Sequence, residues 1–146
     1  MEEYGFNKDL DSYELAWANN QGIVFEECQD LGADAVDYIT KFMLSEVAEN
    51  IDKRVYPYSC AGAAPIKRTA YQKNQPIKPY SDNNHINEDT LYWIGYIYRY
   101  WQNLLGTSSK EIIKIVPVEK AMAFYPACHS MGNKEAIARM INMVDS

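Results

Sequence analysis

The nineteen residues from 87 to 105, NEDTLYWIGYIYRYWQNLL, constrain the fold more than any other part of the chain. Asn87 is a residue type that caps helices, acidic residues follow it, and Gly106 comes directly after the pattern ends. The spacing predicts a helix about 28 Å long. A helix that is apolar on nearly every face is usually the most enclosed element of a bundle, so we expect an all-α protein built around it. Its apolar rows are Leu91, Ile94, Tyr98 and Leu105; Trp93, Ile97 and Trp101; and Tyr92, Tyr96 and Tyr100.

Gly95 lies in the middle of this helix and predicts a close contact between two helices. Glycine costs roughly 1 kcal/mol relative to alanine inside a helix. A glycine at such a position indicates that another backbone approaches it closely.

Five further segments carry helical spacing, and no segment predicts a convincing strand. Gln21-Gly22 ends the first of them, Gly32 interrupts the second, and Ser108 with Glu111 forms a capping box before the third. We therefore expect a single helical domain over residues 1–146, an irregular bundle of five or six helices. The expected helix limits are Asp9 or Asp11 and Asn20, Phe25 and Arg54, Ser108 and Ile115, Pro117 and Pro126, and Asn133 and Val144.

Residues 55–86 differ from the rest because they show no helical period. Proline interrupts a helix and pushes the preceding residue toward extended geometry, so we expect one long irregular loop or arm here. A stretch of this length without regular structure is usually functional or disordered. Its prolines are Pro57, Pro65, Pro76 and Pro79, and its tyrosines are Tyr56, Tyr58, Tyr71 and Tyr80.

Charge is distributed unevenly along the chain. The net charge is −6, but residues 1–54 carry 13 acids and 4 bases. Residues 55–84 carry four bases, with Asp82 as the one acid. An acidic amino-terminal third repels phosphate backbones, so nucleic acid is an unfavourable primary partner.

The cysteines and the hydropathy pattern indicate a cytoplasmic protein. Three cysteines at wide spacing, without a CxxC pair, fit a reducing compartment better than a disulfide framework. The acidic start does not resemble a signal peptide. No run of about 18 apolar residues occurs, so we expect no membrane span.

Residues that could carry chemistry are few and scattered. Possible metal ligands lack the tight spacing of a structural zinc site. Cys128 with His85 as base, or a site around His129 and Arg99, can be imagined, but no catalytic or phosphate-binding signature supports either. We therefore predict no catalytic residue, no metal, no cofactor and no enzymatic activity. The possible ligands are Cys28, Cys60, His85, Cys128 and His129.

The tyrosines outnumber what we expect one small interior to hold, which points to a protein partner. Tyr98, Arg99 and Tyr100 have the composition of an interface hot spot. Arg99 has a second interpretation, an internal ion pair with an acid of residues 25–54 such as Glu46. The predicted partner-binding residues are Tyr71, Tyr80, Tyr98, Arg99 and Tyr100.

Four stretches of the sequence resemble a known family: DYITKFMLSEVAENID, LYWIGYIYRYW, GTSSKEIIKIVP and YPACHSMGNKEAIARMI. The resemblance covers residues 35–144 and is to small helical, antitoxin-like proteins of gut Firmicutes and their mobile elements. These are encoded beside toxin-like genes, some of ADP-ribosyltransferase type. The resemblance implies an inhibitor that neutralises a toxin-like enzyme from a neighbouring gene by occlusion. Residues 55–84 match nothing in that family.

Two other functions fit the same residues. A mobile-element anti-defence protein could use the acidic surface to bind a host nucleic-acid-handling complex. A small enzyme with an unrecognised site is the second. A DNA-binding autoregulator is disfavoured, because no helix-turn-helix and no basic recognition helix occur.

Overall fold

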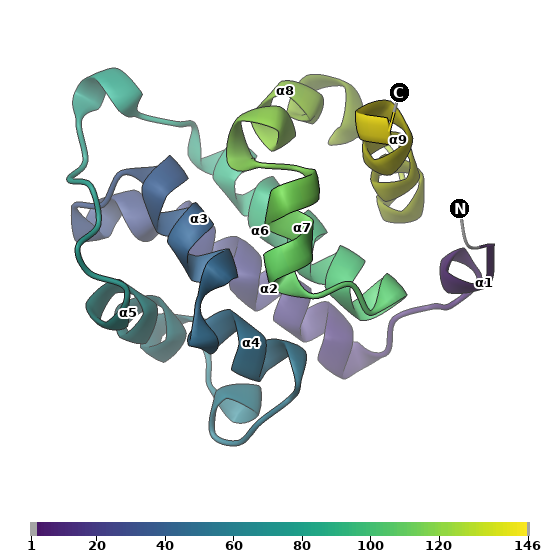
Figure 1. Cartoon of the computed structure of the whole chain (residues 1–146), viewed down its shortest axis with the longest axis horizontal. Helices are drawn as coiled ribbons and strands as arrows, with labels where there is room; N and C mark the ends of the chain where they lie inside the picture. The colour runs from purple at the N-terminus through teal and green to yellow at the C-terminus, as the bar shows by residue number, and fades with distance from the viewer. Residues whose placement is uncertain (1–2, 146) are drawn as a thin grey trace.

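The computed structural model describes residues 3–145, so residues 1, 2 and 146 of the predicted domain lie outside the described part (Figure 1). All regular structure within it is helical, which confirms the all-α prediction. Three short 3-10 turns, η1 (Cys28–Leu31), η2 (Tyr58–Cys60) and η3 (Asp82–Asn84), connect the helices. The α-helices are α1 (Glu3–Phe6), α2 (Ser12–Glu26), α3 (Ala35–Leu44), α4 (Glu46–Asp52), α5 (Ala63–Lys73), α6 (Glu88–Leu105), α7 (Ser109–Ile115), α8 (Val118–Cys128) and α9 (Asn133–Asp145).

Helices α2 and α6 make the most extensive helix–helix contact in residues 3–145. Helices α3 and α7 pack against each other and lie in front of this pair in Figure 1. Helix α6 also contacts α1, α7, α8 and α9. The interior between these layers holds large side chains that are almost fully buried, among them Phe25, Phe42, Ile94, Ile97 and Trp101.

The contact between α2 and α6 depends on two glycines. A Cβ added to Gly95 would touch the carbonyl oxygen of Gln21 and lie 2.9 Å from the Cα of Gly22. This confirms the close approach that Gly95 predicts. The prediction that Gln21-Gly22 ends the first helix is wrong, since α2 continues to Glu26. Packing against α6 outweighs the cost of a glycine inside a helix.

Several helix starts occur where the sequence predicts them. Asn87 accepts a hydrogen bond from the backbone N–H of Asp89 at the start of α6. Ser108 accepts one from the N–H of Glu111 at the start of α7. Asp11, one of the two caps expected for the first helix, caps α2 and forms a capping box with Glu14.

Two further predictions about helix limits are wrong. The break expected at Gly32 occurs, but the part expected to continue as one helix to Arg54 is divided again, and α3 and α4 meet at Ser45. The Ser45 side chain donates to the carbonyl of Phe42 and accepts from the N–H of Ala48. It therefore caps the start of α4 and supplies a hydrogen bond to a backbone carbonyl in the last turn of α3. Pro126 does not end α8, which continues to Cys128. In the last turn a proline removes only one backbone donor, and Pro126 is exposed.

The prediction of an irregular arm over residues 55–86 is also wrong for much of its length. Residues 63–73 form α5, with Pro65 in the first turn, where a helix does not need the missing N–H. Helix α5 packs against α2 and α4 and buries Ile66 and Ala70. The stretch after α5 lies along residues 32–34, where the N–H of Asp34 donates to the carbonyl of Lys78 at 2.8 Å.

None of the helices in residues 3–145 combines the length and the apolar character needed to cross a lipid bilayer.

Candidate protein-binding site

Tyr98, Arg99 and Tyr100 lie inside the protein rather than on its surface. Their exposed fractions are 0%, 1% and 8%. The hydroxyl of Tyr98 donates to the carbonyl of Val116 at 2.6 Å, so its polar end is satisfied internally. The expectation that these three side chains exceed what the interior holds is therefore wrong, and they have no surface to offer a partner in this conformation.

Arg99 is the centre of a buried polar network that joins four helices. Its Nε and Nη2 donate to Oε1 of Gln21 on α2, at 3.0 and 2.8 Å. Its Nη1 donates to Oδ1 of Asp52 on α4, at 2.6 Å. Ser109 of α7 completes the network, because its backbone N–H and its hydroxyl both donate to Asp52.

The internal ion pair of Arg99 agrees with the second interpretation of the sequence, but the acid is Asp52 and not Glu46. Glu46 begins α4 and is exposed, whereas Asp52 ends that helix and faces α7. Burial lowers the pKa of Arg99, and the Asp52 charge opposes that shift. A buried guanidinium needs such a charged partner, because desolvation is costly.

Tyr71 and Tyr80 are half-buried and lie in separate surroundings. Tyr71 packs against the core. Tyr80 forms a hydrogen bond of 3.0 Å with Nδ1 of His85 and contacts that ring edge-on. The five predicted partner-binding residues therefore do not form one surface.

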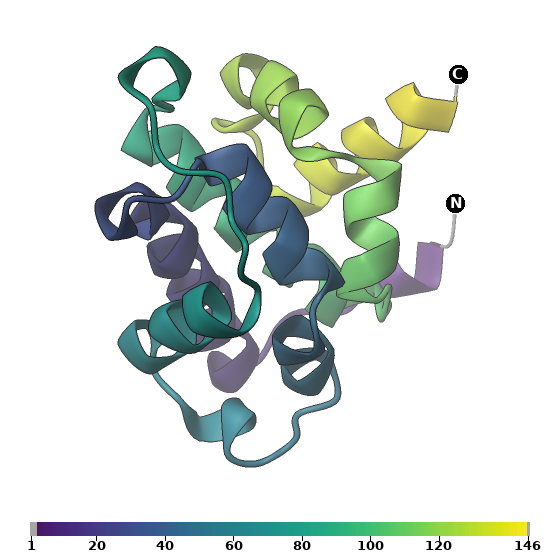
Figure 2. The same ribbon diagram turned by 60° about the vertical axis from the view of Figure 1, so that its left-hand side comes forward.

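Among the large hydrophobic side chains of the described residues, that of Tyr56 is the most exposed, at 78%. It lies in residues 55–60, which we call the tip loop. The loop between α4 and α5 projects from the lower edge of the protein in Figure 2. Val55 beside it is 40% exposed, and Pro57 and Cys60 are also exposed. In the sequence Tyr56 is one of the four tyrosines of residues 55–86, and no feature there ranks it above the other three.

The base of the tip loop is bonded to α2. The carbonyl of Ser59 accepts hydrogen bonds from the hydroxyl of Tyr13 at 3.0 Å and from Nε1 of Trp17 at 3.2 Å. Arg54, just before the loop, pairs with the nearly buried Glu14 at 2.7 Å. These contacts hold the loop in place while leaving its outer side chains in solvent.

The ion pairs of Glu14 predict a loss of stability in acid. Burial alone would raise the pKa of Glu14, but the N–H of Asp11 and the charges of Lys8 and Arg54 outweigh it and lower the pKa below 4.5. Such a group stabilises the fold above its unfolded pKa, and the contribution disappears as the pH falls through the lowered folded pKa. We expect the free energy of unfolding to fall below about pH 5, and to fall less in Glu14→Gln. Urea denaturation at several pH values measures this. Equal pH dependence in both proteins would contradict it.

The residues considered for catalysis are not brought together. Cys128 is buried, and burial raises the pKa of its thiol, which disfavours a nucleophile. Both ring nitrogens of His85 are engaged, Nδ1 with Tyr80 and Nε2 with Glu88 at 3.3 Å. His129 is exposed and bonds to the carbonyl of Tyr125, away from the network of Arg99.

Two features of residues 3–145 bear on metal and small-ligand binding. No group of three or more His, Cys, Asp or Glu side chains in this range is placed to hold a metal ion. A surface pocket of about 570 Å³ lies between α3, α8 and the segment that precedes α6. Side chains of both charges line this pocket. The histidine in its lining, His85, already uses both ring nitrogens in the contacts with Tyr80 and Glu88, so the pocket presents no free imidazole nitrogen. The charged and imidazole residues that line it are Asp34, Asp37, Lys78, His85 and Glu119.

The three cysteines differ enough in exposure to predict their reactivity. Cys60 in the tip loop is exposed, whereas Cys28 and Cys128 are buried, and burial raises the pKa of Cys28 to about 12. We expect one thiol per native chain to react rapidly with an aromatic disulfide reagent, and the other two only after unfolding. A Cys60→Ser variant should show no rapid thiol. Two or more rapid thiols in the native protein would contradict the burial of the others.

Comparisons with protein-family models, with curated proteins and with solved structures each returned no match. What this protein binds therefore has to be inferred from its own exposed residues.

Proposed function

We propose that this protein is an antitoxin-like inhibitor, which binds a toxin-like enzyme and neutralises it by occlusion. The observation that supports this best is Tyr56, 78% exposed on a projecting loop whose base is bonded to α2. Tyrosine is among the residues that dominate binding free energy at protein interfaces. The resemblance of residues 35–144 to antitoxin-like proteins agrees with a partner of this kind.

The fixed geometry of the tip loop favours a role in binding over the alternative that Tyr56 is exposed but has no function. A flexible loop loses conformational freedom when it binds, and that loss weakens affinity. The hydrogen bonds of Tyr13 and Trp17 to Ser59 have already ordered this loop in the free protein. A narrow, ordered projection can enter a cleft that the rest of the helical body cannot enter, and it would then exclude substrate from that cleft.

Co-expression with the toxin-like product of the neighbouring gene tests this function. We expect the wild-type chain to restore growth and to elute with the toxin as one complex in gel filtration. No complex and no rescue of growth would count against the proposal. A salt-sensitive complex with a nucleic-acid-handling host protein in place of the toxin would favour the anti-defence alternative.

A further inference from the structure

Residues 53–81, which we call the basic segment, form a positively charged region in an acidic protein. The segment contains six basic residues and no acidic one, although the whole chain has a net charge of −6. It includes the tip loop and all of α5. Tyr56 therefore lies in a positively charged segment, whereas the rest of the chain carries a net negative charge.

Three of the six bases are engaged by acids of the helical body. Lys53 pairs with Glu49 at 2.9 Å, Arg54 with Glu14 at 2.7 Å, and Lys67 with Glu27 at 2.8 Å. These pairs attach the basic segment to α2 and α4. They also leave the other three bases to determine the outward charge. Those bases are Arg68, Lys73 and Lys78, and all three are exposed.

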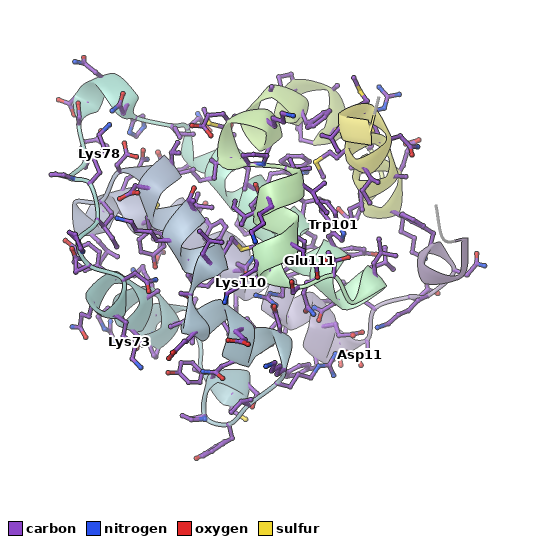
Figure 3. All side chains as sticks on the ribbon, in the orientation of Figure 1. Asp11, Lys73, Lys78, Trp101, Lys110 and Glu111 are labelled. Atoms are coloured by element: carbon purple, nitrogen blue, oxygen red, sulfur yellow. The ribbon has the colours of Figure 1, made fainter. Side chains whose placement is uncertain are left out.

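Arg68 and Lys73 form no ion pair with the described residues, and α5 presents both outward, whereas the charge of Lys78 acts on the carboxylate of Asp37. Lys73 also lies beside the tip loop, since its Nζ is 3.4 Å from the hydroxyl of Tyr58. Figure 3 shows Lys73 and Lys78 on the left-hand side of the protein, the side formed by α5 and the segment that follows it. The apolar, aromatic projection thus has the positive charge of Lys73 next to it.

We propose that Tyr56 inserts into an apolar pocket of the protein partner, and that acidic side chains around this pocket face Arg68 and Lys73. This inference rests on the proposed function and specifies the chemistry of the partner's surface. Buried aromatic anchors supply most of the binding free energy at an interface. Charges at its rim mainly accelerate association and select the partner.

A protein fits the tip loop better than a nucleic acid does. Binding to phosphates requires several unpaired cations along a groove, together with aromatic rings on which bases stack. Here three of the six bases already form ion pairs. The tip loop also projects a single aromatic ring, whereas a groove for nucleic acid would need several. The acidic remainder of the chain would also repel a long phosphate backbone.

The test measures binding of the purified 146-residue chain to the neighbouring toxin-like protein at low and high salt. Three variants are compared with the wild type: Tyr56→Ala, the double variant Arg68→Glu/Lys73→Glu, and the matched control Lys114→Glu/Lys120→Glu. The control makes the same change in net charge at exposed positions of α7 and α8. Thermal unfolding verifies that every variant folds.

We expect Tyr56→Ala to raise the dissociation constant at least about 30-fold, the effect of losing a hot-spot side chain. The double variant is expected to slow association about 10-fold at low salt, and much less at high salt. The control pair should change either quantity less than about 3-fold.

The outcomes separate this inference from the function on which it rests. No complex with the wild-type chain would remove the proposed function, and this inference with it. A complex that Tyr56→Ala leaves unchanged would overturn this inference alone. Binding of a single-stranded oligonucleotide in competition with the toxin would also overturn it. Self-association of the wild type that Tyr56→Ala abolishes would overturn it as well, because the pocket would then belong to a second copy of the chain.

Discussion

Replacing Asp52 by alanine is expected to lower the free energy of unfolding by about 3–5 kcal/mol, the usual cost of removing one partner from a buried ion pair. The guanidinium of Arg99 is 1% exposed, and within residues 3–145 Asp52 is its one charged partner. Without Asp52, only the neutral oxygens of Gln21, Gln102 and Ser109 would face a buried positive charge. The N–H of Ser109 at the start of α7 would lose its acceptor as well.

Urea denaturation of wild type and variant measures this loss directly. Many proteins of this size have only about 5–15 kcal/mol of stability, so Asp52→Ala is expected to leave a marginal fold. Asp52→Asn keeps the shape without the charge and should lose less. Glu46→Ala is the matched control, since Glu46 is an exposed acid on the same helix, and its loss should stay below about 1 kcal/mol. Similar losses for Asp52 and Glu46 would show that Arg99 does not depend on Asp52.

The second large effect is expected at Gly95, where alanine should cost about 2–3 kcal/mol and valine more. The added Cβ would lie 2.8 Å from the carbonyl carbon of Gln21 and 2.9 Å from the Cα of Gly22. Both are backbone atoms of α2, so no side chain can rotate away, and the two helices have to separate. This separation also disturbs Gln21, whose side chain bonds both to the carbonyl of Gly95 and to Arg99.

Two features make the Gly95 result easy to interpret. Alanine has the higher helix propensity by about 1 kcal/mol, so a loss of stability cannot come from the helix itself. Gly132→Ala is the control, because nothing lies within 4 Å of a Cβ added there, and we expect it to cost less than about 1 kcal/mol. An unchanged or raised thermal midpoint for Gly95→Ala would contradict the close contact between α2 and α6.

The Arg99–Asp52 pair and Gly95 belong to one structural unit. Arg99, which the sequence predicts as a partner-binding residue, therefore has a structural role instead. Gln21 connects the pair to Gly95, since its amide donates to Gly95 and its oxygen accepts from Arg99. The network therefore links the contact between α2 and α6 to α4 and α7. Arg99 thus supports the shape of the protein, whereas the side chain of Tyr56 in the tip loop lies mostly in solvent.

The local part of this structure could be predicted from the sequence. Caps, turns and helical spacing are short-range properties of neighbouring residues. For this reason Asn87 and Gly106 mark the limits of α6 correctly, and Ser108 marks the start of α7. Gly95 predicts a close backbone contact for a similar reason, because a glycine inside a helix is unfavourable unless something requires it. The all-α class follows from these signals together.

Only the tertiary structure decided which residues face solvent. Exposure depends on the elements that pack against a residue, and those elements can be distant in the sequence. Arg99 is paired with Asp52, 47 positions away, and residues 63–73 form a helix because α2 and α4 cover Ile66 and Ala70. The same packing encloses Tyr98 and leaves Tyr56 at the end of a projecting loop. Residue type alone cannot separate two such tyrosines, since the free energy of burying a ring depends on the space its neighbours provide.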